Sequence, residues 1–178
     1  MAWDVFDLYA GIGGLGMGFE RAGFTSKGAV DVWDKAIEAN ARLFDHTAAV
    51  TKVMDADSII LESGWEAENG ILVGGPPCQG FSVMGDKNSS DPRNELFKSY
   101  VSLINDLKPK CFVFENVKGL STMYNGQFLE ELKNDFSNCG YDIHFKVINA
   151  YDYGVPQLRE RLFIVGTKLD KNFDFPTL

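Results

Sequence analysis

The sequence predicts an α/β fold, a doubly wound and mostly parallel sheet of about seven strands with helices on both faces. Short apolar runs bounded by turn residues are typical of buried strands, and they recur at 5–9, 28–32, 48–53, 70–73, 111–115, 143–148 and 162–165. Segments with helical periodicity lie between the earlier runs, at 16–22, 35–44, 96–107 and 128–138. Residues 150–157, between the last two runs, have no convincing helical pattern, so we expect an antiparallel last strand.

Length and composition are compatible with a single domain over residues 1–178, of which 45% are hydrophobic. No run approaches the roughly eighteen apolar residues of a membrane span, and the first residues lack the basic segment of an export signal. The cysteines, Cys78, Cys111 and Cys139, have no CxxC or Cys/His spacing, which indicates neither disulfides nor a metal site. We therefore expect a cytoplasmic protein that holds no metal.

The net charge of −8 argues against nucleic-acid binding, because phosphate-binding proteins usually present a basic surface. The acidity is concentrated in residues 1–70, which carry 12 acidic and 5 basic residues, whereas residues 71–178 carry 13 and 12. A surface built from the second part could be locally positive. By itself, however, it would hold DNA weakly and would need help from elsewhere.

A glycine turn directly follows the first predicted strand. Gly11, Gly13 and Gly16 satisfy the pattern GxGxxG, which lets the backbone turn tightly and approach a ligand. Asp31 follows Gly11 by twenty residues, at the end of the second predicted strand, where a carboxylate can accept hydrogen bonds from ribose hydroxyls. These residues predict a nucleotide-type site, although such a turn can also serve only to pack a helix onto a strand.

The fourth predicted strand leads into the segment Gly74-Gly75-Pro76-Pro77-Cys78-Gln79-Gly80. The two prolines fix the approach to Cys78 and would present its thiol at the carboxyl edge of the sheet. A neighbouring strand ends in Glu115 at the same edge, where apolar neighbours would keep the carboxyl partly protonated. The pattern predicts a thiol and an acid facing one pocket, whereas most buried cysteines are inert.

These motifs, in this order, resemble those of the cytosine C5-methyltransferase family. Gln157-Leu158-Arg159-Glu160-Arg161 is similar to the family's Gln-x-Arg-x-Arg element, and the resemblance extends from residue 4 to about residue 176. It implies a Rossmann-like methyltransferase fold and a single catalytic domain. Within that domain, residues 1–70 would be the cofactor-binding half and 71–167 the catalytic half, followed by a tail, 168–178, that leads toward a target-recognition region.

The resemblance implies S-adenosylmethionine as the cofactor. Its binding residues would be Tyr9, Gly11, Gly13, Gly14, Asp31, Val32, Trp33, Asp55, Ala56 and Pro76. Asp31 would hold the ribose hydroxyls, Val32 or Trp33 would flank the adenine, and Asp55 would accept from the adenine amino group. Two positions depart from the usual pattern: Tyr9 stands where the family has phenylalanine, and Asp31 where it more often has glutamate.

The resemblance also implies the chemistry. The Cys78 thiolate would attack C6 of cytosine, Glu115 would contact the N3 edge, and Arg159 and Arg161 would contact the base or orient Glu115. A base inside a duplex is out of reach of the thiol, so the target would be flipped out of the DNA. Four further residues, Gln79, Ser82, Arg93 and Asn116, would contact the substrate, and residues 80–92 could close over the flipped nucleotide.

The family's variable target-recognition region and its final helix are not recognisable in the sequence. We expect DNA as substrate, within restriction–modification, and a second polypeptide that carries the recognition region and the completing helix. The chain could equally be a shortened enzyme or a degenerate copy. Three different functions also stay open: a cofactor-binding or regulatory module without turnover, a nicotinamide-dependent oxidoreductase built on GxGxxG, and a transfer-RNA cytosine methyltransferase.

Overall fold

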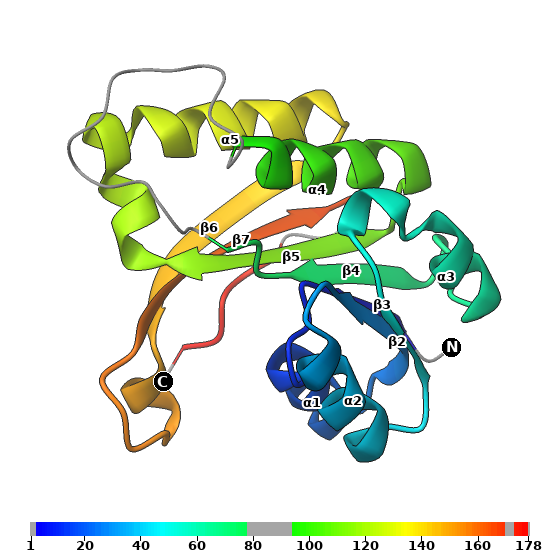
Figure 1. The fold of residues 1–178 in the computed structure, drawn as a ribbon. Coiled ribbons are helices and arrows are strands. Elements are labelled where there is room, and N and C mark those ends of the chain that lie inside the picture. The colour runs from blue at the N-terminus through cyan, green and yellow to red at the C-terminus, as the bar shows by residue number, and fades with distance from the viewer. Residues whose placement is uncertain (1–2, 78–93, 170–172, 178) are drawn as a thin grey trace.

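The computed structural model describes residues 3–77, 94–169 and 173–177. Within these residues, one sheet has the strand order β3-β2-β1-β4-β5-β7-β6 (Figure 1). Its members are β1 (Asp4–Leu8), β2 (Thr25–Asp31), β3 (Thr47–Val50), β4 (Gly70–Gly74), β5 (Cys111–Val117), β6 (Asp142–Asn149) and β7 (Glu160–Thr167). Strands β1 to β5 are parallel, and β7 runs antiparallel to both β5 and β6. The predicted class and the antiparallel last strand are therefore confirmed.

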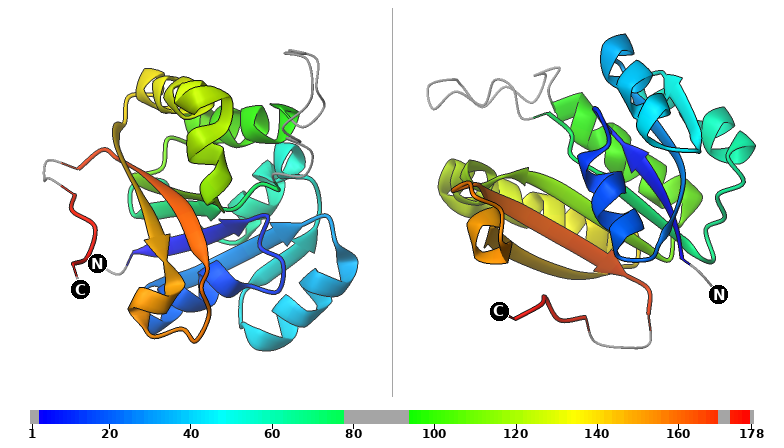
Figure 2. Two further views of the ribbon diagram at one scale, coloured as in Figure 1. Left: turned by 90° about the vertical axis from the view of Figure 1, so that its left-hand side faces the viewer. Right: turned by 90° about the horizontal axis from the view of Figure 1, so that it is seen from below.

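Helices cover both faces of this sheet. The helices are α1 (Gly14–Arg21) and α2 (Asp34–Leu43) on one face, and α3 (Asp57–Glu62), α4 (Asn94–Leu107) and α5 (Gln127–Asn138) on the other (Figure 1). Three short 3-10 segments join them: η1 (Val53–Asp55), η2 (Lys118–Gly126) and η3 (Ala150–Tyr153). Residues 173–177 run back beneath β6 and β7 on the side of α1 (Figure 2), with Phe173 against His144.

Two local predictions were wrong. The apolar run 48–53 is not one strand, because β3 ends at Val50 and Val53 is buried within η1 instead. Helix α3 was missed because it has only six residues, too few for a helical period to stand out. Neither difference changes the strand order.

Side chains alternate between the two faces of the central strands, as a period of two requires. Phe6 and Leu72 enter the main core beneath α3, α4 and α5, whereas Val5 and Ile71 face a smaller core beneath α1. The main core is rich in aromatic rings. Tyr100 of α4 is fully buried there, and its hydroxyl donates to the backbone oxygen of Val113 at 3.0 Å. This packing fixes the sheet whose carboxyl edge carries the predicted site.

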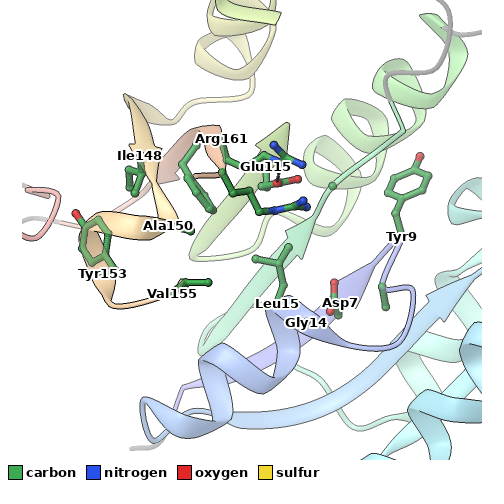
Figure 3. A pocket seen from close by; sticks show the side chains of 14 residues that line it. Asp7, Tyr9, Gly14, Leu15, Glu115, Ile148, Ala150, Tyr153, Val155 and Arg161 are labelled. Carbon is green, nitrogen blue, oxygen red and sulfur yellow. Dashed lines mark ion pairs between the residues drawn. The ribbon is translucent and has the colours of Figure 1, made fainter. Parts of the chain in front are cut away.

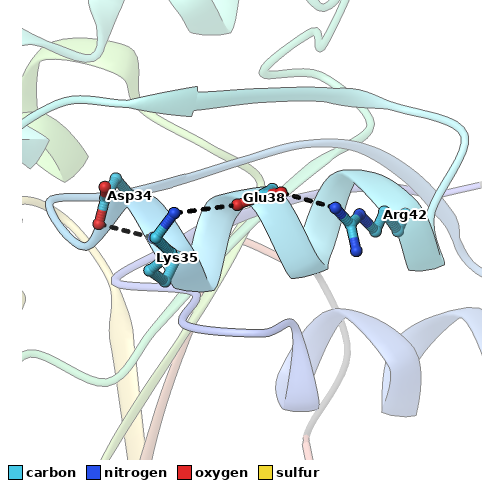
Figure 4. Close-up of polar contacts among 4 residues, drawn as sticks. All are labelled: Asp34, Lys35, Glu38 and Arg42. Carbon is cyan, nitrogen blue, oxygen red and sulfur yellow. Dashed lines mark hydrogen bonds and ion pairs between the residues drawn. The ribbon is translucent and has the colours of Figure 1, made fainter.

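Helix α2 has one buried and one charged face. Ala36, Ile37 and Asn40 are buried, while Glu38 pairs with Lys35 at 3.4 Å and with Arg42 at 2.6 Å on the exposed side (Figure 4). Exposed pairs of this spacing each stabilise a helix by only about 0.3–0.5 kcal/mol. The charged face is therefore a solvated surface whose ion pairs add little stability.

Candidate active site

A cavity of about 480 Å³ opens at the carboxyl edge of the sheet, between the glycine turn, β5, β7 and the loop after β6 (Figure 3). Its lining residues are Asp7, Tyr9, Ala10, Gly14, Leu15, Gly75, Glu115, Ile148, Ala150, Tyr153, Val155, Arg159, Arg161 and Phe163. Of the residues predicted from the sequence, Tyr9, Gly14, Glu115, Arg159 and Arg161 are thus brought together. The predicted cofactor-binding and catalytic halves share this one cavity.

The glycine turn is held from two sides. Gly11 and Gly13 have φ angles of 56° and 99°, which favour glycine, and a Cβ on Gly13 would collide with the ring of Phe44. The Asp31 carboxylate accepts from the backbone N–H groups of Gly11 and Trp33, each at 2.9 Å. Each carboxylate oxygen can accept a further hydrogen bond, so Asp31 can fix the turn and still bind a hydroxyl group.

Asp7 is a cavity residue that sequence reasoning missed. Its side chain is 1% exposed; Oδ2 accepts from the N–H of Gly16 at 3.1 Å, and Oδ1 has no partner among the described residues. Burial raises the pKa of Asp7 to about 7; the Gly16 hydrogen bond opposes this rise and the Asp31 charge adds to it. A carboxylate inside an apolar strand was the available sequence signal, because a buried charge normally has a partner or a function.

The residues predicted to bind adenosine lie outside the cavity. Val32 and Trp33 follow β2 with exposed fractions of 65% and 61%, and Asp55 is exposed at the end of η1. Ala56 is fully buried, its N–H donates to Val53 and its carbonyl accepts from Ile60, so the structure does not expose it to a ligand. Val32, Trp33 and Asp55 form an open rim beside the glycine turn, and the roles of all four residues stay predictions.

Glu115 and Arg161 form an ion pair at the top of the cavity, with 2.9 Å between Oε1 and Nε (Figure 3). The two side chains retain 21% and 23% of their exposure, so the pair is half-buried. Burial raises the pKa of Glu115 and outweighs the opposite effect of Arg161 and Arg159. A Cβ on Gly75 would lie 2.9 Å from Oε2 of Glu115, which explains a glycine at this position.

Asn116 and Pro76 fix the backbone next to the predicted nucleophile. The buried Asn116 side chain donates through Nδ2 to the carbonyl of Pro76 at 2.9 Å, and its Oδ1 accepts from the N–H of Val117. Neither Asn116 nor Pro76 lines the cavity. The structure therefore gives Asn116 a structural contact that sequence reasoning had not foreseen, and its predicted contact with substrate stays a prediction.

Four predicted residues, Cys78, Gln79, Ser82 and Arg93, lie outside the described residues, as do residues 80–92. Gly75, three positions before Cys78, lines the cavity.

The far wall of the cavity comes from the segment after β6, which sequence reasoning did not assign. Asn149 Oδ1 accepts from the N–H groups of Tyr151 at 3.2 Å and Arg159 at 3.0 Å, which closes the loop and places Tyr153 and Val155 opposite Leu15 (Figure 3). Arg159 itself is exposed at the cavity mouth.

The model of the C-5 cytosine-specific DNA methylase family matches residues 3–177. Type II methyltransferase M.XorII of Xanthomonas oryzae is 45% identical over 168 residues, which cover 91% of this chain and 40% of that protein. Type II methyltransferase M.AquIA of Picosynechococcus is 36% identical, and the match covers 99% of this chain and 76% of that protein.

Solved structures agree with this relationship. A prophage-encoded Escherichia coli protein, described as a DNA modification methyltransferase, is 34% identical with a TM-score of 0.78, covering 94% of this chain and 47% of that one. The Dnmt2 methyltransferase of S. pombe shares the fold alone, because it is only 20% identical. Its TM-score is 0.75, and the match covers 98% of this chain and 52% of that one.

The strand order, with β7 antiparallel between β5 and β6, is that of a Rossmann-like, S-adenosylmethionine-dependent methyltransferase. The chain belongs to the C-5 cytosine-specific DNA methylase family. S-adenosylmethionine is accordingly its cofactor, which decides against a nicotinamide-dependent oxidoreductase. The chain spans about half or less of the length of M.XorII and the E. coli protein. No helix in the described ranges is long and apolar enough to cross a membrane.

Proposed function

We propose that this chain transfers a methyl group from S-adenosylmethionine to C5 of cytosine in DNA, through a covalent adduct with Cys78. The observation that carries the proposal is the half-buried Glu115–Arg161 pair, which faces the same cavity as the glycine turn. Residues 1–70 would hold the cofactor and residues 71–167 would supply the chemistry, with both parts meeting at the cavity.

The residues around the glycine turn fit the cofactor. Asp31 has free lone pairs for the ribose hydroxyls, and the exposed Trp33 ring offers an apolar surface for the adenine. The unpartnered Oδ1 of Asp7 suits a cationic group such as the methionine ammonium, because a buried carboxylate gains most from an opposite charge. When bound, the cofactor supplies an electrophilic methyl group on a sulfonium.

The chemistry follows from the weak nucleophilicity of C5. Addition of the Cys78 thiolate to C6 forms a C–S bond and moves the ring electrons toward C5 and N3. Arg161 holds Oε1 of Glu115, burial favours the protonated form of this carboxyl, and in the proposed mechanism it gives a proton to N3 as the adduct forms. C5 then takes the methyl group as the S–CH3 bond of the sulfonium breaks. A water molecule removes the C5 proton, the C6–S bond breaks to release the thiolate, and N3 returns its proton to Glu115.

We further propose that DNA reading depends on a second polypeptide with a target-recognition region and a completing helix. Exposed apolar side chains, Ile12, Trp33 and Met54, surround the cofactor rim and would be covered by such a helix. The net charge of −8 also favours a basic partner that meets the phosphates. The named relatives are type II methyltransferases, which supports a role in DNA modification. We propose the cytoplasm as its location.

Covalent trapping tests the proposal. DNA that contains 5-fluorocytosine should trap the chain, because fluorine cannot leave C5 as a cation, and the adduct should map to Cys78. The assay is run with the chain alone and together with candidate partners encoded beside it. A transfer RNA with the same modified base provides the competing substrate.

Cys78→Ser should abolish trapping. Cys111→Ser is the matched control, because burial raises the pKa of the Cys111 thiol to about 11 and this thiol should be inert. Trapping that persists in Cys78→Ser, or that maps to Cys111 or Cys139, would remove Cys78 from the mechanism. If only the transfer RNA traps the chain, the substrate is transfer RNA and not DNA.

A further inference from the structure

Tyr9 connects the cofactor site to helix α4 through its hydroxyl group. The hydroxyl donates to the backbone carbonyl of Leu96, in the first turn of α4, at 2.9 Å, although the two residues are 87 positions apart. The ring lines the cavity and points away from Asp7 and Leu15 toward the helix (Figure 3). A phenylalanine could fill the same space but could not make this hydrogen bond.

The backbone at Tyr9 adopts a conformation that needs support. Its φ angle is 57°, in the left-handed region that costs a non-glycine residue about 1–2 kcal/mol. Such a conformation persists only where the surroundings hold it. Here the ring packs against the main core and the hydroxyl is anchored on α4, so the position of the turn and the position of α4 depend on each other.

Helix α4 touches the cofactor rim at a second place. It packs against η1, the segment that ends in Asp55. Burial raises the pKa of the Tyr9 hydroxyl well above its usual value, so the hydroxyl is a protonated donor to Leu96 at neutral pH.

We infer that the Tyr9 hydroxyl is a positioning link, through which occupancy of the cofactor site orders the first turn of α4. A ligand that orders the glycine turn restricts the ring of Tyr9, and the ring restrains Leu96. By reciprocity, fraying of this turn of α4 lowers cofactor affinity. The link rests on the proposed cofactor site, but it gives Tyr9 a task beyond contact with the cofactor.

Hydrogen exchange on the full chain, with and without S-adenosylmethionine, tests the link in the wild type and in Tyr9→Phe. The relevant amides are those of residues 98–101, whose helical partners are the carbonyls of residues 94–97. In the wild type the cofactor should slow their exchange by about five-fold, the equivalent of one neutral hydrogen bond. In Tyr9→Phe this slowing should disappear, while cofactor affinity falls by no more than about five-fold.

Tyr141→Phe is the matched control. Its hydroxyl donates to the carbonyl of Pro109 at 2.7 Å, in a buried contact of the same kind that lies away from the cavity. This variant should lose stability but keep the cofactor-dependent slowing at 98–101. Slowing that survives in Tyr9→Phe, or that is lost equally in Tyr141→Phe, would overturn the link alone. Absence of cofactor binding by the wild type would overturn the proposed function and the link together.

Discussion

Two regions of the candidate site hold their carboxylates in different ways. Beside the glycine turn, Asp31 and Asp7 accept hydrogen bonds from backbone N–H groups, and neither forms an ion pair with another described residue. In the other region, Glu115 is held by the guanidinium of Arg161. Backbone N–H groups fix a carboxylate as part of the turn, whereas a side-chain cation orients a carboxyl that can still exchange a proton. The first region is suited to binding and the second to chemistry.

The largest expected effect is a fall in the rate of methyl transfer when Glu115 is replaced. Glu115→Gln keeps the size of the side chain but cannot supply a proton to N3 through a carboxyl group, so kcat should fall by about 10²–10³-fold. Cofactor affinity should change by less than about three-fold, because Glu115 lies across the cavity from the glycine turn. Single-turnover methyl transfer with saturating cofactor measures the rate. An unchanged kcat would assign Glu115 a structural role only.

The next effect is a pH dependence of stability at Asp7. The carboxyl titrates at about pH 7 in the folded chain and near 3.8 when unfolded, so between these values the folded state binds more protons. The free energy of unfolding should therefore decrease as the pH rises from about 4 to 7, by about 3 kcal/mol from this group. Denaturant unfolding of wild type and Asp7→Asn measures the two slopes, and the slope of the variant should be shallower. Parallel slopes would contradict a protonated Asp7.

A smaller effect is expected at Gly75, where the two regions meet. Gly75→Ala would bring a Cβ within 2.9 Å of Oε2 of Glu115, so the carboxyl has to shift away from its place opposite the base. A displacement of this size should lower kcat by about ten-fold and leave cofactor affinity unchanged. Gly119→Ala is a suitable control, because a Cβ there meets nothing within 4 Å. If the two substitutions change kcat equally, the space that Gly75 leaves beside Oε2 of Glu115 does not matter for the reaction.

The order of the motifs was enough to predict the fold class, and the family resemblance implied that Arg159 or Arg161 would orient Glu115. Glu115 lies near the carboxyl end of β5, and Arg161 reaches the same edge because it lies near the amino end of the antiparallel strand β7. Other features depend on contacts between distant residues. The anchor of Tyr9 is a backbone carbonyl, which no sequence pattern marks. Asp7 was hidden within an apolar run, and the polar atoms of Asn116 turned out to bind backbone groups. Periodicity reports which face a residue occupies, but not which polar atom it meets there.

Calorimetric titration of S-adenosylmethionine into the wild type, Asp31→Asn and Glu115→Gln tests the division of the candidate site most directly. Asp31→Asn keeps the shape of the side chain but weakens its charge-assisted hydrogen bonds, so the Kd should rise by about ten-fold or more. Glu115→Gln should bind with nearly the wild-type Kd. The account is contradicted if both substitutions weaken binding equally, or if Glu115→Gln alone abolishes it.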